Sequence, residues 1–239
     1  MSEAGRQTVI EAVGLAKIYW DGSNSLKILS DISLSVYKGE GIAVIGPSGC
    51  GKSTLLNLLS GLDRPTEGAV RLLGKELGRL GEAEKARLRA NGVGFVFQAY
   101  HLLPEFTALE NVMVPLLVAG RSEPEAAQKA ALALAEVGLT ERAGHYPSEL
   151  SGGEQQRAAI ARAVVNDPEI VFCDEPTGNL DPGTASGISE LIERLYRQKG
   201  RTVVIVTHDE RLAARATRVW ELVGKSWRPS GTARPKEDR

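Results

Sequence analysis

A glycine-rich segment near residue 50 has the residue types and spacing of a phosphate-binding loop. It reads GPSGCGKST and lies between a short apolar run, Gly41–Ile45, and a helical pattern, Lys52–Ser60. In such loops the glycines let backbone N–H groups point at phosphates, the lysine reaches the terminal phosphates, and the serine hydroxyl ligates Mg²⁺. The residues expected to contact a nucleotide are Gly46, Pro47, Ser48, Gly49, Cys50, Gly51, Lys52, Ser53 and Thr54.

Two carboxylates follow another apolar run, Ile170–Cys173. Asp174 and Glu175 would lie at the carboxyl end of a parallel strand, which is the edge where such sheets bind ligands. Asp174 suits an outer ligand of Mg²⁺, and Glu175 suits a general base or a group that positions the attacking water. Alone, the pair would be a solvated acidic turn before Pro176, but the phosphate-binding loop favours the catalytic interpretation.

Two other polar residues are expected at the same edge of the sheet. His208 follows the strand pattern Thr202–Val206, and from there it can reach a γ-phosphate, although a lone histidine is more often structural. Gln98 ends the run Val93–Phe97, where an amide can ligate Mg²⁺ and sense the γ-phosphate. The predicted catalytic group is Glu175, His208, Gln98 and Lys52, and the predicted metal ligands are Ser53, Gln98 and Asp174.

A second glycine-rich segment, LSGGEQQR at Leu150–Arg157, leads into the helical pattern Glu154–Val165. Ser151, Gly152 and Gly153 combine a hydroxyl, backbone N–H groups and a helix N-terminus, which together form an anion site. One nucleotide needs only one phosphate loop directly behind it. This second site is therefore expected to face a nucleotide across an interface.

An aromatic residue and two cysteines are further candidates. Tyr19 ends the first strand pattern, where its ring could stack on adenine. Trp20 could compete for that role, and a packed aromatic at a sheet edge is the alternative interpretation. Cys50 and Cys173 should lie close to the nucleotide, and the simpler interpretation is that both are small buried residues. The alternative for Cys50 is that its oxidation or alkylation blocks nucleotide binding.

Strand patterns that alternate with helical patterns predict an α/β fold with a mostly parallel sheet. Strand patterns with a period of two, at Thr8–Tyr19 and Ile28–Val36, come before the phosphate loop. A strand at Ala69–Leu73 and a helix at Glu82–Ala90 follow it. From 99 to about 147 the patterns are helical, at Ala108–Val118 and Glu123–Val137. We expect one domain over 1–225, with a core at about 1–98 and 159–225, a helical subdomain at about 99–158, and a flexible tail over 226–239.

Composition and net charge limit the classes of function that the chain can have. The 239 residues are 42% hydrophobic and 25% charged, as in soluble globular proteins. A formal net charge of -1 argues against a nucleic-acid partner, and two cysteines fit a reducing compartment. The start lacks a signal-peptide pattern, and the most apolar stretch, Val112–Ala119, is much shorter than the ~20 residues that span a bilayer. The chain is not expected to cross a membrane by itself.

In this order, Tyr19, GPSGCGKST, Gln98, LSGGEQQR, IVFCDEP, Asp181 and His208 resemble the ATP-binding subunit of ABC transporters over about residues 9–222. The resemblance implies a P-loop ABC ATPase core with an N-terminal antiparallel β part and an inserted helical subdomain. In that family two copies pair head-to-tail around two ATP molecules. Each ATP would be held by Gly46–Thr54 of one copy and Ser151–Gly153 of the other.

The resemblance also implies individual roles. Gln98 would sense Mg²⁺ and the transmembrane partner, and Asp174 would support the metal. Glu175 would be the base, His208 would steady the γ-phosphate, and Asp181 would communicate across the dimer.

A finer resemblance is carried by FQAYHLLPEFTALENV, by GLDRPTEG at Gly61–Gly68 and by DEPTGNLD at Asp174–Asp181. These segments are similar to the lipoprotein-releasing ATPases and their macrolide-exporter relatives. The likeness implies a transport ATPase on the cytoplasmic face of the inner membrane, bound to four-helix permease subunits of the FtsX and lipoprotein-releasing type. Apolar residues near Gln98 would either dock that partner or pack the core of the insert, namely Tyr100, Leu102, Leu103 and Phe106.

Other functions are open alternatives. The chain could serve a related macrolide or peptide exporter or a cell-division-type complex, or it could be a soluble ABC ATPase without a permease. DNA-repair types carry long coiled coils and translation types carry tandem domains, and neither pattern is present. A module that binds ATP without hydrolysis is disfavoured by Glu175 and His208.

Overall fold

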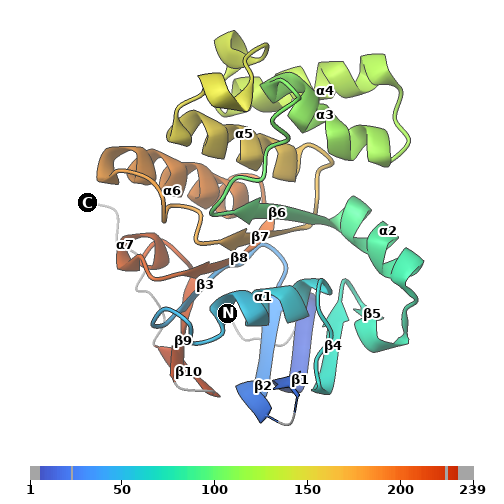
Figure 1. Ribbon diagram of the computed structural model, residues 1–239, viewed down its shortest axis with the longest axis vertical. Coiled ribbons are helices and arrows are strands. Elements are labelled where there is room, and N and C mark those ends of the chain that lie inside the picture. Colours follow the sequence, from blue (N-terminus) through green and yellow to red (C-terminus); the bar gives the residue numbers. More distant parts are fainter. Residues whose placement is uncertain (1–5, 23, 224–225, 231–239) are drawn as a thin grey trace.

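The computed structural model describes residues 6–22, 24–223 and 226–230, and it arranges them in layers (Figure 1). A six-stranded sheet lies in the middle. One of its faces is covered by helix α1 (Lys52–Ser60) and a four-stranded antiparallel sheet, and the other is covered by helices from later in the chain. The mixed α/β architecture confirms the predicted fold class.

The central sheet is parallel except at one edge. In spatial order its strands are β10 (Ser226–Ser230), β9 (Arg218–Val223), β3 (Gly41–Ile45), β8 (Thr202–Thr207), β7 (Ile170–Asp174) and β6 (Val93–Phe97). Only β10 runs antiparallel to its neighbour, β9.

The register of the parallel strands aligns their carboxyl ends. Ile45 of β3 lies opposite Thr207 of β8, Val206 of β8 lies opposite Asp174 of β7, and Asp174 lies opposite Phe97 of β6. The residues that follow these strands must therefore emerge at one edge of the sheet.

The uninterrupted apolar runs of β7 and β8 result from burial on both faces. Successive side chains of a strand point to opposite sides, and those of β7 alternate between two cores. Ile170 and Phe172 pack in the core that contains α1, whereas Val171 and Cys173 pack in the core that contains the helical subdomain. The sheet is thus the wall that the two cores share.

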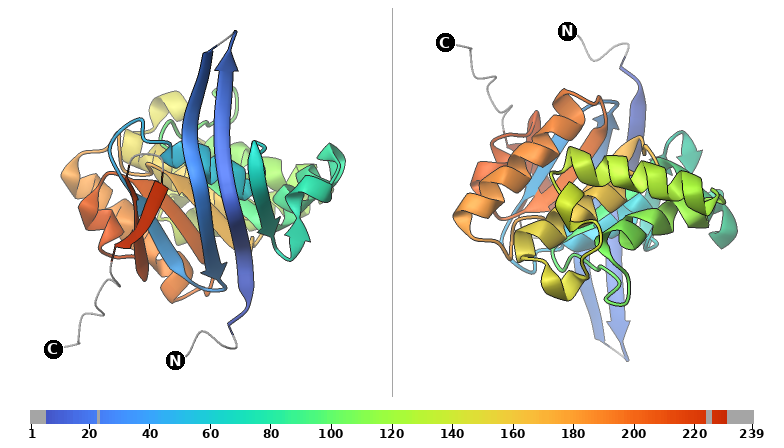
Figure 2. Two further views of the ribbon diagram at one scale, coloured as in Figure 1. Left: turned by 90° about the horizontal axis from the view of Figure 1, so that it is seen from below. Right: turned by 90° about the horizontal axis from the view of Figure 1, so that it is seen from above.

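The antiparallel sheet has the order β2-β1-β4-β5. Its strands are β1 (Thr8–Asp21), β2 (Asn24–Tyr37), β4 (Glu67–Leu72) and β5 (Lys75–Glu76). β1 and β2 form a long hairpin whose far end projects beyond the rest of the fold (Figure 2).

The inserted helical subdomain is built on capped helices. Thr107 caps α3 (Ala108–Val118) through a reciprocal pair of hydrogen bonds with Glu110, and Ser151 caps α5 (Gly152–Val164) in the same way with Glu154. Such capping boxes satisfy backbone N–H groups that the first turn leaves unpaired.

The remaining helices of the described chain are α2 (Glu82–Gly92), α4 (Glu123–Glu136), α6 (Pro182–Arg197) and α7 (Glu210–Ala213), and the 3-10 turns are Leu77–Arg79, Thr140–Arg142 and Pro147–Glu149.

The structure differs from the sequence-based predictions at residues 226–230 and at the start of α5. Residues 226–230, expected in a flexible tail, form β10 and pair with β9, because their backbone groups complete the edge of the sheet; the other tail residues, 231–239, lie outside the described residues. Gly152 and Gly153, expected before the helix, are its first residues. Within the described part of the chain, no helix has the length and apolar character needed to span a bilayer.

Gly94 lets helix α5 approach strand β6 closely. A Cβ atom at this position would lie 2.1 Å from the carbonyl oxygen of Ala163 in α5. We expect Gly94→Ala to reduce the free energy of unfolding by about 1–3 kcal/mol, the usual cost of overpacking, as measured by urea denaturation. Gly144→Ala is the matched control, because an added Cβ there meets no atom within 4 Å. Equal unfolding midpoints for the two variants would contradict this packing argument.

Candidate active site

The loop Gly46–Thr54 runs from the end of β3 into the first turn of α1. Gly51 has φ 103°, and a Cβ there would lie 2.8 Å from Cγ2 of Ile28, so both the backbone and the space require glycine. The buried Lys52 donates from Nζ to the carbonyl oxygens of Gly46 at 3.0 Å and Pro47 at 3.2 Å. Its ammonium group therefore lies inside the curve of the loop.

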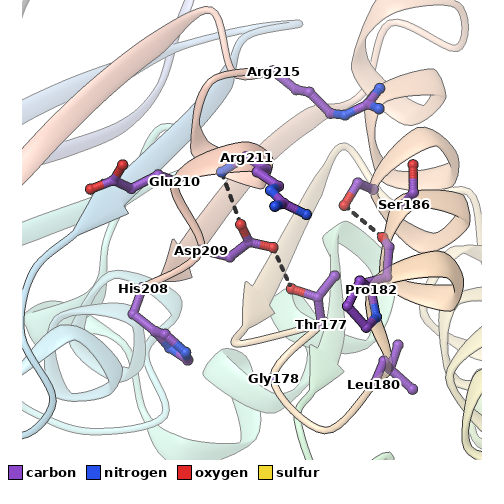
Figure 3. A pocket seen from close by; sticks show the side chains of 12 residues that line it. Thr177, Gly178, Leu180, Pro182, Ser186, His208, Asp209, Glu210, Arg211 and Arg215 are labelled. Atoms are coloured by element: carbon purple, nitrogen blue, oxygen red, sulfur yellow. Dashed lines mark hydrogen bonds between the residues drawn. The ribbon is translucent and has the colours of Figure 1, made fainter.

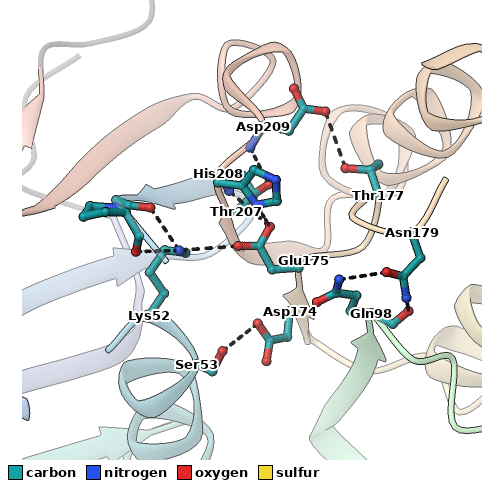
Figure 4. Close-up of polar contacts among 12 residues, drawn as sticks. Lys52, Ser53, Gln98, Asp174, Glu175, Thr177, Asn179, Thr207, His208 and Asp209 are labelled. Atoms are coloured by element: carbon teal, nitrogen blue, oxygen red, sulfur yellow. Dashed lines mark hydrogen bonds and ion pairs between the residues drawn. The ribbon is translucent and has the colours of Figure 1, made fainter. Parts of the chain in front are cut away.

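Glu175 connects this lysine to His208 (Figure 4). One carboxylate oxygen lies 3.4 Å from Lys52 Nζ, and the other accepts the backbone N–H of His208 at 3.1 Å and lies 2.9 Å from the ring atom Nδ1. The backbone of Glu175 has φ 45°, in the left-handed region. That conformation is uncommon for residues with a side chain and is found at sites where the surrounding structure holds it.

Asp174 faces the start of α1. Its Oδ1 accepts a hydrogen bond of 3.0 Å from the Ser53 hydroxyl. Burial raises the pKa of the Asp174 carboxyl, the hydrogen bond from Ser53 opposes this, and the negative charge of Glu175 raises the pKa further. A bound cation would remove that electrostatic cost.

The oxygen atoms of Ser53 and Asp174 are hard donors of the kind that Mg²⁺ prefers. The described residues contain no cluster of three or more His, Cys, Asp or Glu side chains placed to hold a metal ion. A Mg²⁺ ion here would therefore take its remaining ligands from phosphates and water, as it commonly does in proteins. The donor set fits such an ion.

Gln98 extends beyond β6 toward the loop that follows β7. Its amide nitrogen donates to Oδ1 of Asn179 at 3.0 Å, and the amide of Asn179 donates to the carbonyl oxygen of Gln98 at 3.2 Å. This pair fixes the Gln98 side chain on the opposite side of the site from Lys52 (Figure 4). A cavity of about 380 Å³ lies between them, lined by Ile28, Ser48, Gly49, Gly51, Lys52, Ser53, Thr54, Gln98, Glu175 and His208.

Tyr19 lies beside the phosphate loop rather than in the cavity lining. Its hydroxyl donates to Oδ2 of Asp63 at 2.9 Å, and the residue is 44% exposed. Trp20, the next residue of the same strand, points to the opposite face because strand side chains alternate. The alternative role for Trp20 therefore loses its support, and adenine stacking by Tyr19 stays a prediction.

The two cysteines are free thiols in different surroundings. Cys50 is half-buried in the phosphate loop, and Cys173 is fully buried in β7. Burial, and then the negative charge of Asp174, raise the pKa of the Cys173 thiol. Cys173 is thus a small core residue, as the simpler interpretation had it.

The second glycine-rich segment lies apart from this cavity. Ser151, Gly152 and Gly153 are not among its lining residues in the described structure. The carboxylate of Glu154 accepts hydrogen bonds from the Ser151 hydroxyl at 2.7 Å and from the Ser151 N–H at 2.8 Å, and Arg142 lies 3.0 Å away on the other oxygen. These hydrogen bonds lower the pKa of Glu154 from 4.5 to about 2, and those from Ser151 have a larger effect than the one from Arg142.

Asp181 begins helix α6, where its Oδ1 accepts from the N–H groups of Gly183 at 3.0 Å and Thr184 at 3.1 Å. Its neighbours Leu180 and Pro182 line a second cavity of about 570 Å³, which His208 also lines (Figure 3). The ring of His208 therefore lies between the catalytic cavity and this second one.

The sequence missed several contacts that organise the site. Asn179, Asp63 and Arg142 were not identified as site residues, because their roles depend on side chains distant along the chain. The capping box formed by Ser151 and Glu154 was visible in the S-x-x-E spacing, and it could have been predicted.

The chain is similar to known proteins over most of its length. A family model described as "ABC transporter" matches residues 29–178. The chain is 52% identical over 216 residues to the lipoprotein-releasing system ATP-binding protein LolD of Geobacter metallireducens, covering 90% of this chain and 96% of that protein. It is 51% identical over 218 residues to LolD of Pseudomonas syringae pv. tomato, covering 91% and 96%.

Solved structures give the same picture. The ATP-binding cassette MJ0796, in a dimeric post-hydrolysis state bound to ADP and Pi, is similar with a TM-score of 0.88 and 38% identity, over 94% of this chain and 99% of that one. A second dimeric structure of the same bacterial ABC transporter cassette matches with a TM-score of 0.88 and 39% identity, at the same coverage.

The low pKa of Glu154 predicts a pH-dependent contribution to stability. Because the pKa is about 2 in the folded chain and 4.5 ordinarily, the stabilisation is complete above pH 4.5 and is lost as the pH falls toward 2. Wild type should therefore be more stable than Glu154→Gln near pH 6, and the difference should shrink below pH 4.5. Urea midpoints measured across this range test it. Glu141→Gln, at an exposed position in the neighbouring 3-10 turn, is the control. A difference that does not change with pH would contradict the assignment.

Proposed function

Since the chain belongs to the ABC transporter family, we propose that it is the ATP-hydrolysing subunit of a transporter that releases lipoproteins from the inner membrane. It acts as a dimer on permease subunits, from the cytoplasmic face of that membrane. The observation that carries the catalytic part is the position of Glu175, which lies between Lys52 and His208 at the edge of the cavity formed by the phosphate loop.

In this proposal each side chain has a separate role in ATP binding or hydrolysis. Lys52 exchanges its contacts with loop carbonyls for the β- and γ-phosphate oxygens, and N–H groups of the loop bind the phosphates. Glu175 accepts a proton from the attacking water, and His208 orients the carboxylate through its backbone N–H and ring. Gln98 closes the opposite side of the cavity, where it contacts the γ-phosphate region.

Mg²⁺ would be held by the Ser53 hydroxyl, with Gln98 beside it and Asp174 behind it. When bound, the ion neutralises phosphate charge in the transition state. The hydrogen bond between Ser53 and Asp174 supports this assignment, because it fixes the hydroxyl of a residue that lines the cavity beside a carboxylate.

A second copy of the chain completes the site. Ser151–Gly153 lie outside the catalytic cavity of their own chain, yet they present a hydroxyl and a helix N-terminus suited to a phosphate. The dimeric state of the similar cassette bound to ADP and Pi supports pairing of this kind. Asp181 and the cavity beside it would face the second copy.

A loop between Gln98 and α3 presents the docking surface for the permease. The buried Asn111 holds this loop, because its amide nitrogen donates to the carbonyl oxygens of Leu103, Phe106 and Thr107 and its oxygen accepts from the N–H of Leu103. Leu102 packs against the core, whereas Leu103 and Phe106 are 41% and 40% exposed. Leu102 therefore fits the core-packing interpretation, and docking by the exposed pair stays a prediction, since exposed apolar side chains suit a partner.

The base role of Glu175 gives the first test. We expect Glu175→Gln to bind ATP with nearly unchanged affinity, to lose about 10²-fold or more in turnover, and to accumulate an ATP-bound dimer. Turnover is measured by phosphate release, and the dimer by size-exclusion chromatography with ATP. Glu67→Gln, on the exposed surface of β4, should behave as wild type. Near-normal turnover of Glu175→Gln would remove Glu175 from the base role.

The docking surface gives the second test. Phe106→Asp should abolish co-purification with the permease subunits and the ATP-dependent release of a lipoprotein from proteoliposomes that contain them. ATP hydrolysis by the isolated chain should stay unchanged. Leu132→Asp in α4 is the matched control, because Leu132 is also apolar and is 63% exposed. If Phe106→Asp binds the permease as well as Leu132→Asp does, the partner docks elsewhere. If wild type binds the permease and releases no lipoprotein, the cargo assignment is wrong.

A further inference from the structure

The segment GLDRPTEG, at Gly61–Gly68, contributes no residue to the lining of the catalytic cavity. It follows directly from α1, the helix that begins in the phosphate loop. Gly61 ends that helix in the left-handed conformation, with φ 72°, and the N–H of Asp63 donates to the carbonyl oxygen of Asn57 at 3.1 Å. The position of Asp63 is thus fixed by the helix that carries Lys52 and Ser53.

Asp63 contacts two residues of strand β1 with its two carboxylate oxygens. Oδ2 accepts the hydroxyl of Tyr19 at 2.9 Å, and Oδ1 accepts Nζ of Lys17 at 2.8 Å. Lys17 also donates to the carbonyl oxygen of Arg64 at 2.7 Å, and it is only 8% exposed. The Tyr19 hydroxyl and the Lys17 ammonium group are therefore both held by the segment Gly61–Gly68.

The contacts leave one face of the Tyr19 ring for a ligand. Nζ of Lys17 lies 4.7 Å from the ring centre, in a cation–π contact that covers one face. Tyr19 as a whole is nevertheless 44% exposed. A ring whose hydroxyl and one face are fixed loses little conformational freedom when a base stacks on the other face.

From this arrangement we propose that Asp63 is a positioning residue for the base of the nucleotide: it orients Tyr19, through the phenolic hydroxyl and through Lys17, as a preformed stacking platform. The proposal rests on the proposed function of the site, in which Tyr19 receives adenine. Helix α1 then connects the two parts of the site: it begins in the phosphate loop, and Asp63 lies three residues beyond its last residue and is bonded back to Asn57.

The charge states of the pair agree with this geometry. Burial alone would raise the pKa of Asp63, but hydrogen bonds from Lys17 and Tyr19 lower it below its ordinary value. Burial raises the pKa of Tyr19, the hydrogen bond and charge of Asp63 add to this, and the nearby hydroxyl of Thr54 opposes it. Asp63 is therefore an anionic acceptor, and Tyr19 is a neutral donor whose hydroxyl lies next to the phosphate-loop helix.

The bond between Asp63 and Tyr19 is not needed to attach the segment to β1. The hydroxyl of Thr66 accepts the N–H of Ile18 at 3.0 Å, and the N–H of Thr66 donates to the carbonyl oxygen of Ala16 at 2.9 Å. Thr66→Val removes an attachment of the same segment to the same strand and leaves Tyr19 untouched. It is therefore a matched control for a purely structural role.

The test compares two ligands that differ in the base. Dissociation constants are measured on the purified chain for ATP and for inorganic triphosphate, which has no base to stack. Asp63→Asn should weaken ATP binding about threefold to tenfold, the range expected for one lost hydrogen bond, and should leave triphosphate binding unchanged. Tyr19→Phe should do the same, and the double variant should be no weaker than either single one. Thr66→Val should leave the ratio of the two constants at the wild-type value.

Two results would overturn the inference. If Asp63→Asn weakens ATP and triphosphate equally, or affects neither, Asp63 does not act through the base. The same measurement on Tyr19→Ala separates this failure from failure of the premise. That variant should lose about tenfold or more in ATP affinity relative to triphosphate. If Tyr19→Ala keeps the wild-type affinity for ATP, Tyr19 is not the platform and that part of the proposed function fails. If Tyr19→Ala loses affinity for ATP while Asp63→Asn does not, only the role of Asp63 is wrong.

Discussion

The in-register pairing of four parallel strands is the constraint on which the catalytic cavity depends. β3, β8, β7 and β6 end at the same level, so the residues that follow them must share one edge. Gly46, His208, Glu175 and Gln98 come from positions spread over more than half of the chain, yet each is the first residue or nearly the first beyond its strand. A shift of one residue in any strand would turn its side chains to the opposite face and remove one group from the site. The two hydrophobic cores hold that register.

The same constraint explains why Ser151–Gly153 lie apart from the catalytic cavity of their own chain. α5 is not preceded by a strand of the central sheet. It starts in the helical subdomain, after the 3-10 turn Pro147–Glu149. Its N-terminus therefore has no reason to reach the edge where the parallel strands end. A free helix N-terminus carries partial positive charge and unpaired N–H groups. In this structure the carboxylate of Glu154 accepts hydrogen bonds from the N–H and the hydroxyl of Ser151. Binding of a phosphate from a second copy would compete with this carboxylate for the Ser151 hydroxyl.

Much of the fold and of the cavity could be predicted because the signals are local. The phosphate loop, the carboxylates after β7 and the parallel βα pattern each depend on neighbours in the sequence. Strands β9 and β10 could not be predicted in the same way, since the edge position of a short strand depends on the sheet that it joins. The contacts of Gln98 with Asn179 and of Tyr19 with Asp63 join residues far apart in the chain. Such pairs follow from tertiary packing, and no spacing in the sequence encodes them.

Helix α5 links Ser151, at its N-terminus, to the loop between Gln98 and α3, which it contacts near its C-terminus. Ser151, which caps its first turn, is the residue proposed to face the second copy. Near its last turn, Arg162 donates to the carbonyl oxygens of Tyr100 and His101, two consecutive residues with φ 58° and 50°. These left-handed residues lie between Gln98 and the exposed Leu103, so Arg162 holds the bend at the start of the proposed docking loop. The close contact of Ala163 with Gly94 fastens the same end of the helix to β6, the strand that carries Gln98. In the proposed dimer, this helix of 13 residues would have the γ-phosphate of the partner copy at one end, and Gln98 and the proposed docking loop at the other. Closure of such a dimer over ATP would therefore transmit force along α5 to the docking loop.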